Sequence, residues 1–301
     1  MAAVVGRPVV RAAGLVVWRQ GASGTEVLTV HRPAWQDWVL PKGHIDEGEL
    51  PPVTACREFT EESGYRGVAA RPVAVMDYPV KNTTKRVHWW VGRLIGSSSR
   101  PPADPREIDA VVWRPVADAL AVLTYADERQ VLTKALALGS SRTLVIVRHA
   151  KAAPRETWTK ADSLRPLSER GQRQAKKLRE LLAAYGVGAL MASPAARCKQ
   201  TLRPYSQSRH VKIELRPELS DEAVRPSDLA RLMRELRADL LADSVPRAIC
   251  GHLPSLPAMA ASLGWGEDIE TVPMKTAEAL VLHLDARTGS VQASERYRCL
   301  L

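Results

Sequence analysis

The stretch GHIDEGELPPVTACREFTEESGY, residues 43–65, carries the densest chemistry in the chain and decides the fold of its first half. Its prolines, followed by a run without helix breakers, predict a helix over 52–63, because proline is tolerated in the first turn of a helix. On that helix Glu58, Glu61 and Glu62 stand three and four positions apart. The three carboxylates therefore share one face.

Three like charges on one helix face repel one another, and a bound cation would relieve that repulsion. Mg²⁺ prefers oxygen ligands and bridges substrate phosphates, so the acidic face predicts a Mg²⁺ site, with Mn²⁺ as a substitute. Arg57 could pair with a neighbouring acid and hold the geometry. The alternative is a solvated acidic helix face that binds no metal.

The same stretch resembles the Nudix box, G-x5-E-x7-R-E-U-x-E-E-x-G-U, where U is a bulky aliphatic residue. The departures are aromatic residues, Phe59 and Tyr65, at the two U positions. The resemblance implies an α/β/α sandwich around a mixed sheet. It also implies a hydrolase in which water attacks phosphorus within a nucleoside diphosphate linked to another group.

Residue roles follow from this resemblance. It implies that Glu58, Glu61 and Glu62 are metal ligands or the catalytic base, and which glutamate is the base stays open. It implies a further ligand in the carbonyl of Gly43. Glu107 stands where many members place an extra acid before the last strand, and an ordinary loop acid is the alternative.

The segment WVLPKGH, residues 38–44, is similar to one found in hydrolases of dinucleoside polyphosphates and diphosphoinositol polyphosphates. Its Lys42 would present a point charge to a polyphosphate, the alternative being a surface lysine. Tyr125 resembles a tyrosine of the diadenosine-tetraphosphate enzymes. It could stack on a base, or it could be a core residue.

Three segments of the second half place chemistry next to predicted strands. The buried strand TLVIVR leads into His149, ALMAS precedes Arg197, and RAIC is followed by a glycine and His252. Open α/β sheets bind ligands at the carboxyl ends of parallel strands, so these side chains are expected to meet. Phosphoryl transfer needs in-line placement and charge neutralisation, for which arginines offer fixed forks.

Together these segments resemble the histidine phosphatase superfamily in its short SixA-like branch. The RHG motif stands here as RHA, followed by SPxxRxxQT and GHxP. The resemblance implies that His149 attacks phosphorus and becomes a phosphohistidine, without a metal. Arg148, Arg197 and His252 would form the cationic phosphoryl pocket, and Arg165 would bind substrate. The proton donor stays open among three acids, Asp162, Asp221 and Glu222.

The predicted fold class is α/β in two parts. A Nudix domain with a mixed sheet is expected over 1–138, a linker over 139–142 and a doubly wound histidine-phosphatase domain over 143–301. The apolar runs at 11–18 and 26–32, parted by a Gly/Ser turn, predict a hairpin. In the second part strands alternate with helices, which favours a largely parallel sheet.

The composition of the chain limits which partners and which cellular compartment are expected. The net charge of +10 comes from scattered bases without a basic tract, so no nucleic-acid partner is expected. The four cysteines lie far apart and predict reduced thiols in a cytoplasmic protein. The sequence contains no run of about 18 apolar residues, so no membrane span is expected. The partners expected are small-molecule nucleotide polyphosphates, and the oligomeric state is open, a homo-oligomer included.

A Nudix domain followed by a SixA-like domain is similar to the large MutT-like proteins of actinobacteria. This implies hydrolysis of 8-oxo-GTP or 8-oxo-dGTP to the diphosphate, of diadenosine polyphosphates such as Ap4A, or of both. The second domain could then process the products. One alternative is a hydrolase of diphosphoinositol polyphosphates or inorganic polyphosphate, favoured by the basic charge. Another is a nucleotide-sensing protein with an inactive second domain.

Overall fold

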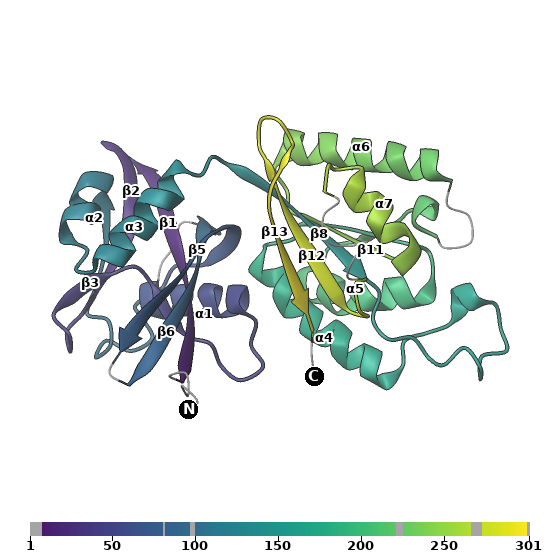
Figure 1. Cartoon of the computed structure of the whole chain (residues 1–301), viewed down its shortest axis with the longest axis horizontal. Helices are drawn as coiled ribbons and strands as arrows, with labels where there is room; N and C mark the ends of the chain where they lie inside the picture. Colours follow the sequence, from purple (N-terminus) through teal and green to yellow (C-terminus); the bar gives the residue numbers. More distant parts are fainter. Residues whose placement is uncertain (1–7, 81, 97–99, 221–224, 266–272, 300–301) are drawn as a thin grey trace, which may run out of the picture. The chain divides into compact units, whose positions relative to one another are not determined.

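The computed structural model describes residues 8–80, 82–96, 100–220, 225–265 and 273–299. The chain forms two compact units, Met1–Gly139 and Ser140–Leu301. Each unit has its own sheet with helices against it, so the predicted α/β class is confirmed (Figure 1). None of the helices in the described ranges is long and apolar enough to cross a membrane.

The sheet of the first unit is mixed, as the family resemblance implied. Its central pair, β1 and β6, is parallel, and the other pairings are antiparallel. The order is β3-β2-β1-β6-β5, with β4 on β1 and β7 on β2. The strands are β1 (Val9–Gly21), β2 (Gly24–Arg32), β3 (Asp37–Val39), β4 (Lys42–His44), β5 (Gly67–Val80), β6 (Thr83–Leu94) and β7 (Ala110–Pro115).

Helices cover both faces of this sheet, and the side chains of β1 show why. Successive residues of a strand point to opposite faces, yet the run 12–17 is buried throughout. Ala12 and Val16 join a core cluster with α2 (Val116–Val122) and α3 (Ala126–Ala137). On the other face, Leu15 and Phe59, on α1 (Pro51–Ser63), both lie against Gly67. The result is the expected α/β/α sandwich.

The sheet of the second unit is parallel over four strands and antiparallel at one edge. Its order is β10-β9-β11-β8-β12-β13, and β12 joins β8 in the antiparallel sense. The strands are β8 (Ser141–Arg148), β9 (Ala189–Ala192), β10 (Ile213–Leu215), β11 (Arg247–Gly251), β12 (Glu278–Asp285) and β13 (Val291–Arg298). Strand β8 begins at Ser141, inside the expected linker, because Ser141 pairs with Asp285 of β12.

The helices of this unit are α4 (Glu169–Ala184), α5 (Ala196–Arg209), α6 (Pro226–Asp243) and α7 (Leu256–Ala261). Three short 3₁₀ turns accompany them at Asp162–Leu164, Pro217–Leu219 and Leu253–Ser255.

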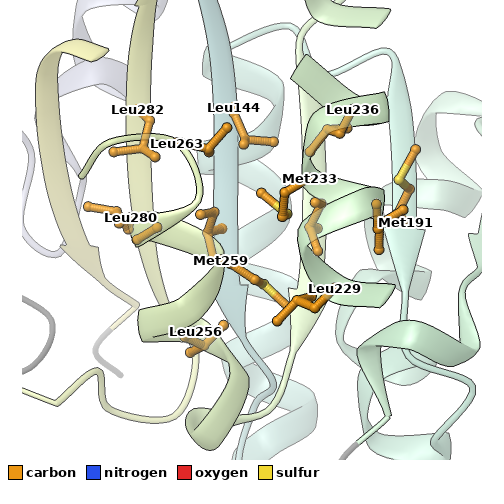
Figure 2. Close-up of a cluster of buried hydrophobic side chains, with 14 of the residues drawn as sticks. Leu144, Met191, Leu229, Met233, Leu236, Leu256, Met259, Leu263, Leu280 and Leu282 are labelled. Carbon is orange, nitrogen blue, oxygen red and sulfur yellow. The ribbon is translucent and has the colours of Figure 1, made fainter. Parts of the chain in front are cut away.

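One face of the second sheet packs on α6 and α7. Figure 2 shows this cluster, in which Leu144 and Leu280 of the sheet meet Met233 and Met259 of the helices. The alternate β8 residue Val145 is equally buried and therefore faces the opposite side. Figure 1 shows α4 on that opposite side, so helices cover both faces of the sheet.

Candidate active sites

Helix α1 presents the acidic face and must end at Gly64. This residue adopts a left-handed conformation with φ 70°, and its N–H donates to the carbonyl of Thr60 at 2.9 Å. A Cβ there would overlap the carbonyl oxygen of Arg100, whose N–H donates to the carbonyl of Gly64. Glycine at this position therefore serves both the helix end and the close approach of the following loop.

Arg57 organises the carboxylates beside it, as the sequence predicted. Its guanidinium donates to Glu49 at 2.9 and 3.1 Å, to Glu58 at 2.8 Å and to Glu61 at 3.0 Å. It also donates to the carbonyl of His44 at 3.0 Å. One planar fork thus ties the segment before the helix to two of the three glutamates.

Glu62 points away from that fork. Its carboxylate accepts a hydrogen bond from the backbone N–H of Lys42 at 2.9 Å, and the residue is only 6% exposed. Burial raises the pKa of Glu62 to about 8, despite the opposing effect of Lys42, and the charges of Glu58 and Glu107 add to the rise. Burial likewise raises the pKa of Glu58, against the effect of Arg57.

The residues expected to hold a metal lie in one region but are not gathered around a point. Within the described ranges, no three acidic, histidine or cysteine side chains converge to hold an ion. The backbone of Gly43 lies against the Glu58 carboxylate, since a Cβ there would overlap it. Glu107 is exposed, and its charge reaches both Glu58 and Glu62. Buried, mutually repelling carboxylates beside a carbonyl suit a hard cation.

The side chain of Lys42 lines a cavity of about 420 Å³. Lys42 is 8% exposed, so it is not the surface lysine of the alternative interpretation. Its Nζ lies 2.9 Å from the Glu128 carboxylate, which also accepts from the N–H of Leu40 at 2.6 Å. The walls combine cationic and aromatic side chains, namely Arg32, Trp35, Lys42, Tyr78, Lys85, Trp89 and Tyr125, with the two acids Asp127 and Glu128.

A hydrogen bond of its hydroxyl, and not burial of its ring, holds Tyr125 in position. The hydroxyl donates to Asp37 at 2.8 Å, and Arg32 pairs with the same carboxylate at 2.5 and 2.8 Å. Tyr125 is 44% exposed and lines the cavity, so it is not a core residue. The rigid hydroxyl anchor leaves the ring able to stack on a ligand.

Sequence reasoning missed most of the cavity wall, Arg32, Trp35 and Lys85 included. Lys85 is partly buried, and burial followed by the charges of Lys42 and Arg32 lowers its pKa to about 8. These residues come from β2, the loop after it and β6, which meet only in the folded sheet. Trp35 is exposed in the structure, and a large exposed aromatic side chain often marks a binding surface.

The second site forms where parallel strands end together, as predicted. His149 directly follows β8, and its N–H donates to the carbonyl of Gly251 in β11 at 3.1 Å. The ring of His149 lies 5.2 Å from that of His252. Its Nδ1 donates to the carbonyl of Ala150 at 2.8 Å, which leaves the lone pair of Nε2 free. Burial, then the neighbouring cations, lowers the pKa of His149 to about 3, so the ring is neutral.

Arg197 and His252 are buried and held on several sides. Arg197 donates to the carboxylate of Asp162 at 3.0 Å and to Nδ1 of His252 at 3.3 Å. His252 Nε2 lies 3.0 Å from the hydroxyl of Ser193 and 3.5 Å from the thiol of Cys198. These contacts fix both side chains close to His149.

Asp162 gathers three arginines. Its carboxylate lies 2.8 Å from Arg165, 3.2 Å from Arg155 and 3.0 Å from Arg197. The hydrogen bond from Arg165, outweighing burial, holds the pKa of Asp162 well below its usual range. Both oxygens of the Asp162 carboxylate are thus engaged by arginines, and its role as the proton donor stays a prediction. The other two acids considered, Asp221 and Glu222, lie outside the described residues.

A cavity of about 360 Å³ opens beside His149. Arg148 and Arg165 line it as expected, whereas Arg197 and His252 are not part of its wall. Arg148 is held by a hydrogen bond of 2.6 Å to the carbonyl of Met274. Sequence reasoning missed four further polar wall residues, Lys151, Arg155, Glu156 and Thr276.

Comparisons with known proteins match both halves of the chain. A NUDIX domain model matches residues 8–136, and a model of the histidine phosphatase superfamily (branch 1) matches 144–228. The chain is 39% identical over 224 residues to an 8-oxo-(d)GTP phosphatase of Mycolicibacterium smegmatis, covering 71% of this chain and 69% of that protein. It is 29% identical over 137 residues to an asymmetrical bis(5'-nucleosyl)-tetraphosphatase of Caenorhabditis elegans, covering 42% and 94%.

Two solved structures are similar to one unit each. A C. elegans Ap4A hydrolase binary complex aligns at 28% identity with a TM-score of 0.39, covering 42% of this chain and 96% of that one. The protein histidine phosphatase SixA complexed with tungstate aligns at 22% identity with a TM-score of 0.43, covering 52% and 97%. On its family models and its M. smegmatis relative, the chain belongs to the Nudix hydrolases, as a member that carries a histidine phosphatase superfamily domain after the Nudix domain.

Proposed function

We propose that the Nudix domain hydrolyses nucleoside polyphosphates with Mg²⁺, for which Mn²⁺ can substitute. The proposed reactions are conversion of 8-oxo-GTP and 8-oxo-dGTP to the diphosphates and cleavage of diadenosine polyphosphates such as Ap4A. The names of two relatives support these substrates, an 8-oxo-(d)GTP phosphatase and an asymmetrical bis(5'-nucleosyl)-tetraphosphatase.

The observation that carries the proposal is the double contact of Lys42. Its backbone N–H holds the carboxylate of Glu62, while its side chain lines the cationic and aromatic cavity. The acidic region and the cavity therefore adjoin at one residue. A nucleotide in the cavity would have its phosphates beside Lys42 and Lys85 and directed at the acidic residues of α1.

The donor set supports a divalent cation. The carboxylates of Glu58, Glu61 and Glu62, the carbonyl of Gly43 and the acid Glu107 would hold it. When bound, the ion neutralises phosphate oxygens and lowers the pKa of a water. Of the chain's own groups, one of the α1 glutamates accepts the proton of the attacking water, and Arg57 holds Glu58 and Glu61 in place.

The aromatic walls favour a nucleotide over the alternatives. Trp35, Tyr78 and Tyr125 line the cavity, and flat rings stack on a nucleobase. Inositol pyrophosphates and inorganic polyphosphate would use the cations Arg32, Lys42 and Lys85 but leave these rings without a partner. For the same reason 8-oxo-guanine and adenine nucleotides are the substrates to test first.

In the second domain we propose a phosphatase that trims products of the Nudix step. His149 is the nucleophile, since its Nε2 lone pair is free and its ring is neutral. Arg148 and Arg165 bind phosphoryl oxygens from the cavity wall, while Arg197 adds positive charge near the nucleophile and holds His252 in place. Bond formation from Nε2 to phosphorus then breaks the bond from phosphorus to the oxygen that links it to the rest of the product, and leaves a phosphohistidine.

Product analysis by anion-exchange chromatography tests both parts. The full chain is incubated with 8-oxo-GTP or Ap4A, with Mg²⁺ or with EDTA. We expect 8-oxo-GDP from the first, and ATP plus AMP from the second, only with Mg²⁺. His149→Ala should alter later products and not the first cleavage. Intact nucleotides that bind without cleavage would indicate a sensor, and competition by inositol phosphates alone would indicate the inositol class.

A further inference from the structure

One carboxylate in the wall of the second cavity has no role in the scheme above. Glu156 lines this cavity together with Arg148, His149 and Lys151. It is the single acid among the lining residues. It is exposed, and in the ranges that the structure describes its carboxylate has no hydrogen-bond or ion-pair partner.

We propose that Glu156 is the proton-transfer residue of the second active site, which rests on the proposed phosphatase function. In the dephosphorylation step the ionised Glu156 carboxylate takes a proton from water as the water oxygen attacks phosphorus. The P–O bond forms, the P–N bond breaks, and the electron pair returns to Nε2 of His149. By reversibility, the protonated Glu156 gives its proton to the leaving ester oxygen when the phosphohistidine forms.

Among the described residues around the nucleophile, Asp162 and His252 are already engaged by other groups. Asp162 is ionised and held by three arginines, so each of its oxygens already accepts charged donors. His252 has both ring nitrogens engaged, Nδ1 with Arg197 and Nε2 with Ser193. Of the groups described near the nucleophile, Glu156 has the carboxylate that faces the cavity and is free to move.

The charge of the cavity fits the same role. Arg148, Lys151, Arg155 and Arg165 would bind a phosphoryl group, and an acid in their midst is unfavourable for anion binding alone. A carboxylate there costs affinity for phosphate. A proton-transfer role accounts for its position, because in an in-line reaction the attacking water and the leaving oxygen would both lie opposite the nucleophile, towards the cavity that Glu156 lines.

The test is burst kinetics of the full-length Glu156→Gln protein with p-nitrophenyl phosphate in EDTA. This leaving group departs without protonation, so the first step should persist as a burst of about one equivalent of nitrophenol. Steady-state turnover should fall by roughly a hundredfold or more. An acid-labile phosphohistidine should accumulate at the same time. Glu156→Asp should restore part of the turnover, and Glu235→Gln, an ion-paired glutamate on α6, should behave as wild type.

Each outcome of this experiment either supports or overturns the proposed role of Glu156. Unchanged turnover of Glu156→Gln would overturn the proposal. So would an equal loss of burst and turnover without trapped phosphohistidine, because a structural defect would slow both steps. If the wild type showed no hydrolysis dependent on His149, the phosphatase function itself would fail, and the role of Glu156 with it.

Discussion

The buried ion pair between Lys42 and Glu128 joins the cavity of the first unit to helix α3, and Glu128→Gln tests what it contributes to stability. The two charged groups lie 2.9 Å apart, with side chains 5% and 6% exposed. The amide of glutamine keeps an oxygen for the N–H of Leu40. The substitution therefore removes the charge and leaves this hydrogen bond in place.

The expected cost is large because Lys42 is left buried without its counter-charge. Removal of one partner of a buried pair costs about 3–5 kcal/mol, whereas loss of an exposed pair costs about 0–1 kcal/mol. Addition of Lys42→Met to Glu128→Gln removes the stranded charge. The double variant should therefore recover most of the lost stability, to within about 2 kcal/mol of wild type.

Urea unfolding of the full chain, followed by tryptophan fluorescence, measures the effect on the first unit. Asp127→Asn, the neighbouring exposed acid on α3, is the control and should change the free energy of unfolding by less than about 0.5 kcal/mol. A Glu128→Gln protein within about 1 kcal/mol of wild type would refute the reasoning. A double variant less stable than the single one would refute it as well.

Three further predictions concern the helix end and the second domain. Gly64→Ala should lower the free energy of unfolding of the first unit, measured in urea, by more than about 2 kcal/mol. A side chain strains the left-handed backbone at this position, and its Cβ overlaps Arg100. A loss below about 1 kcal/mol would contradict this. Because the pKa of His149 falls from 6.5 to about 3 on folding, the unfolded chain binds the extra proton. Stability of the second unit should thus decline from pH 6.5 towards pH 3, and His149→Asn should flatten this part of a pH-dependent urea series; an unchanged slope would count against a buried neutral ring. Asp162→Asn should raise the KM for p-nitrophenyl phosphate about tenfold, because Arg165 and Arg197 lose the carboxylate that orients them. An unaltered KM would show that Asp162 does not orient these arginines for substrate binding.

Local patterns predicted the helix of the Nudix box well. The sequence indicated 52–63 and the helix spans Pro51–Ser63, because prolines mark its start and Gly64 its end. The i, i+3, i+4 spacing placed Glu58, Glu61 and Glu62 on one helix. It could not show that Glu62 turns to the backbone of Lys42, because that contact depends on how β4 docks.

Elements without a local signal were missed. Strand β10 has three residues, too few for an alternating pattern, and exists through its pairing with β9. Helix α7 is short, Leu256–Ala261, and a 3₁₀ turn, Leu253–Ser255, precedes it. Pro254 and Pro257 stand in the first turns of these two elements, where the missing N–H of proline is tolerated.

In the candidate sites, too, some residues could be predicted from the sequence and others could not. Motif residues such as His149 and Arg197 could be named from the sequence because they follow predicted strands. The walls of the cavities could not, since Lys85 and Trp35 meet Lys42 only through strand pairing. The rim acid Glu156 lies in a loop with no pattern of its own.

The most direct test of the account is the initial rate of 8-oxo-GTP hydrolysis by Glu62→Gln at saturating Mg²⁺. The matched control is Glu47→Gln, an exposed glutamate before the helix. We predict a loss of at least about a hundredfold for Glu62→Gln and none for the control, since the amide cannot ionise to hold the cation or accept a proton. A Glu62→Gln rate within twofold of wild type would contradict the placement of the active site on α1.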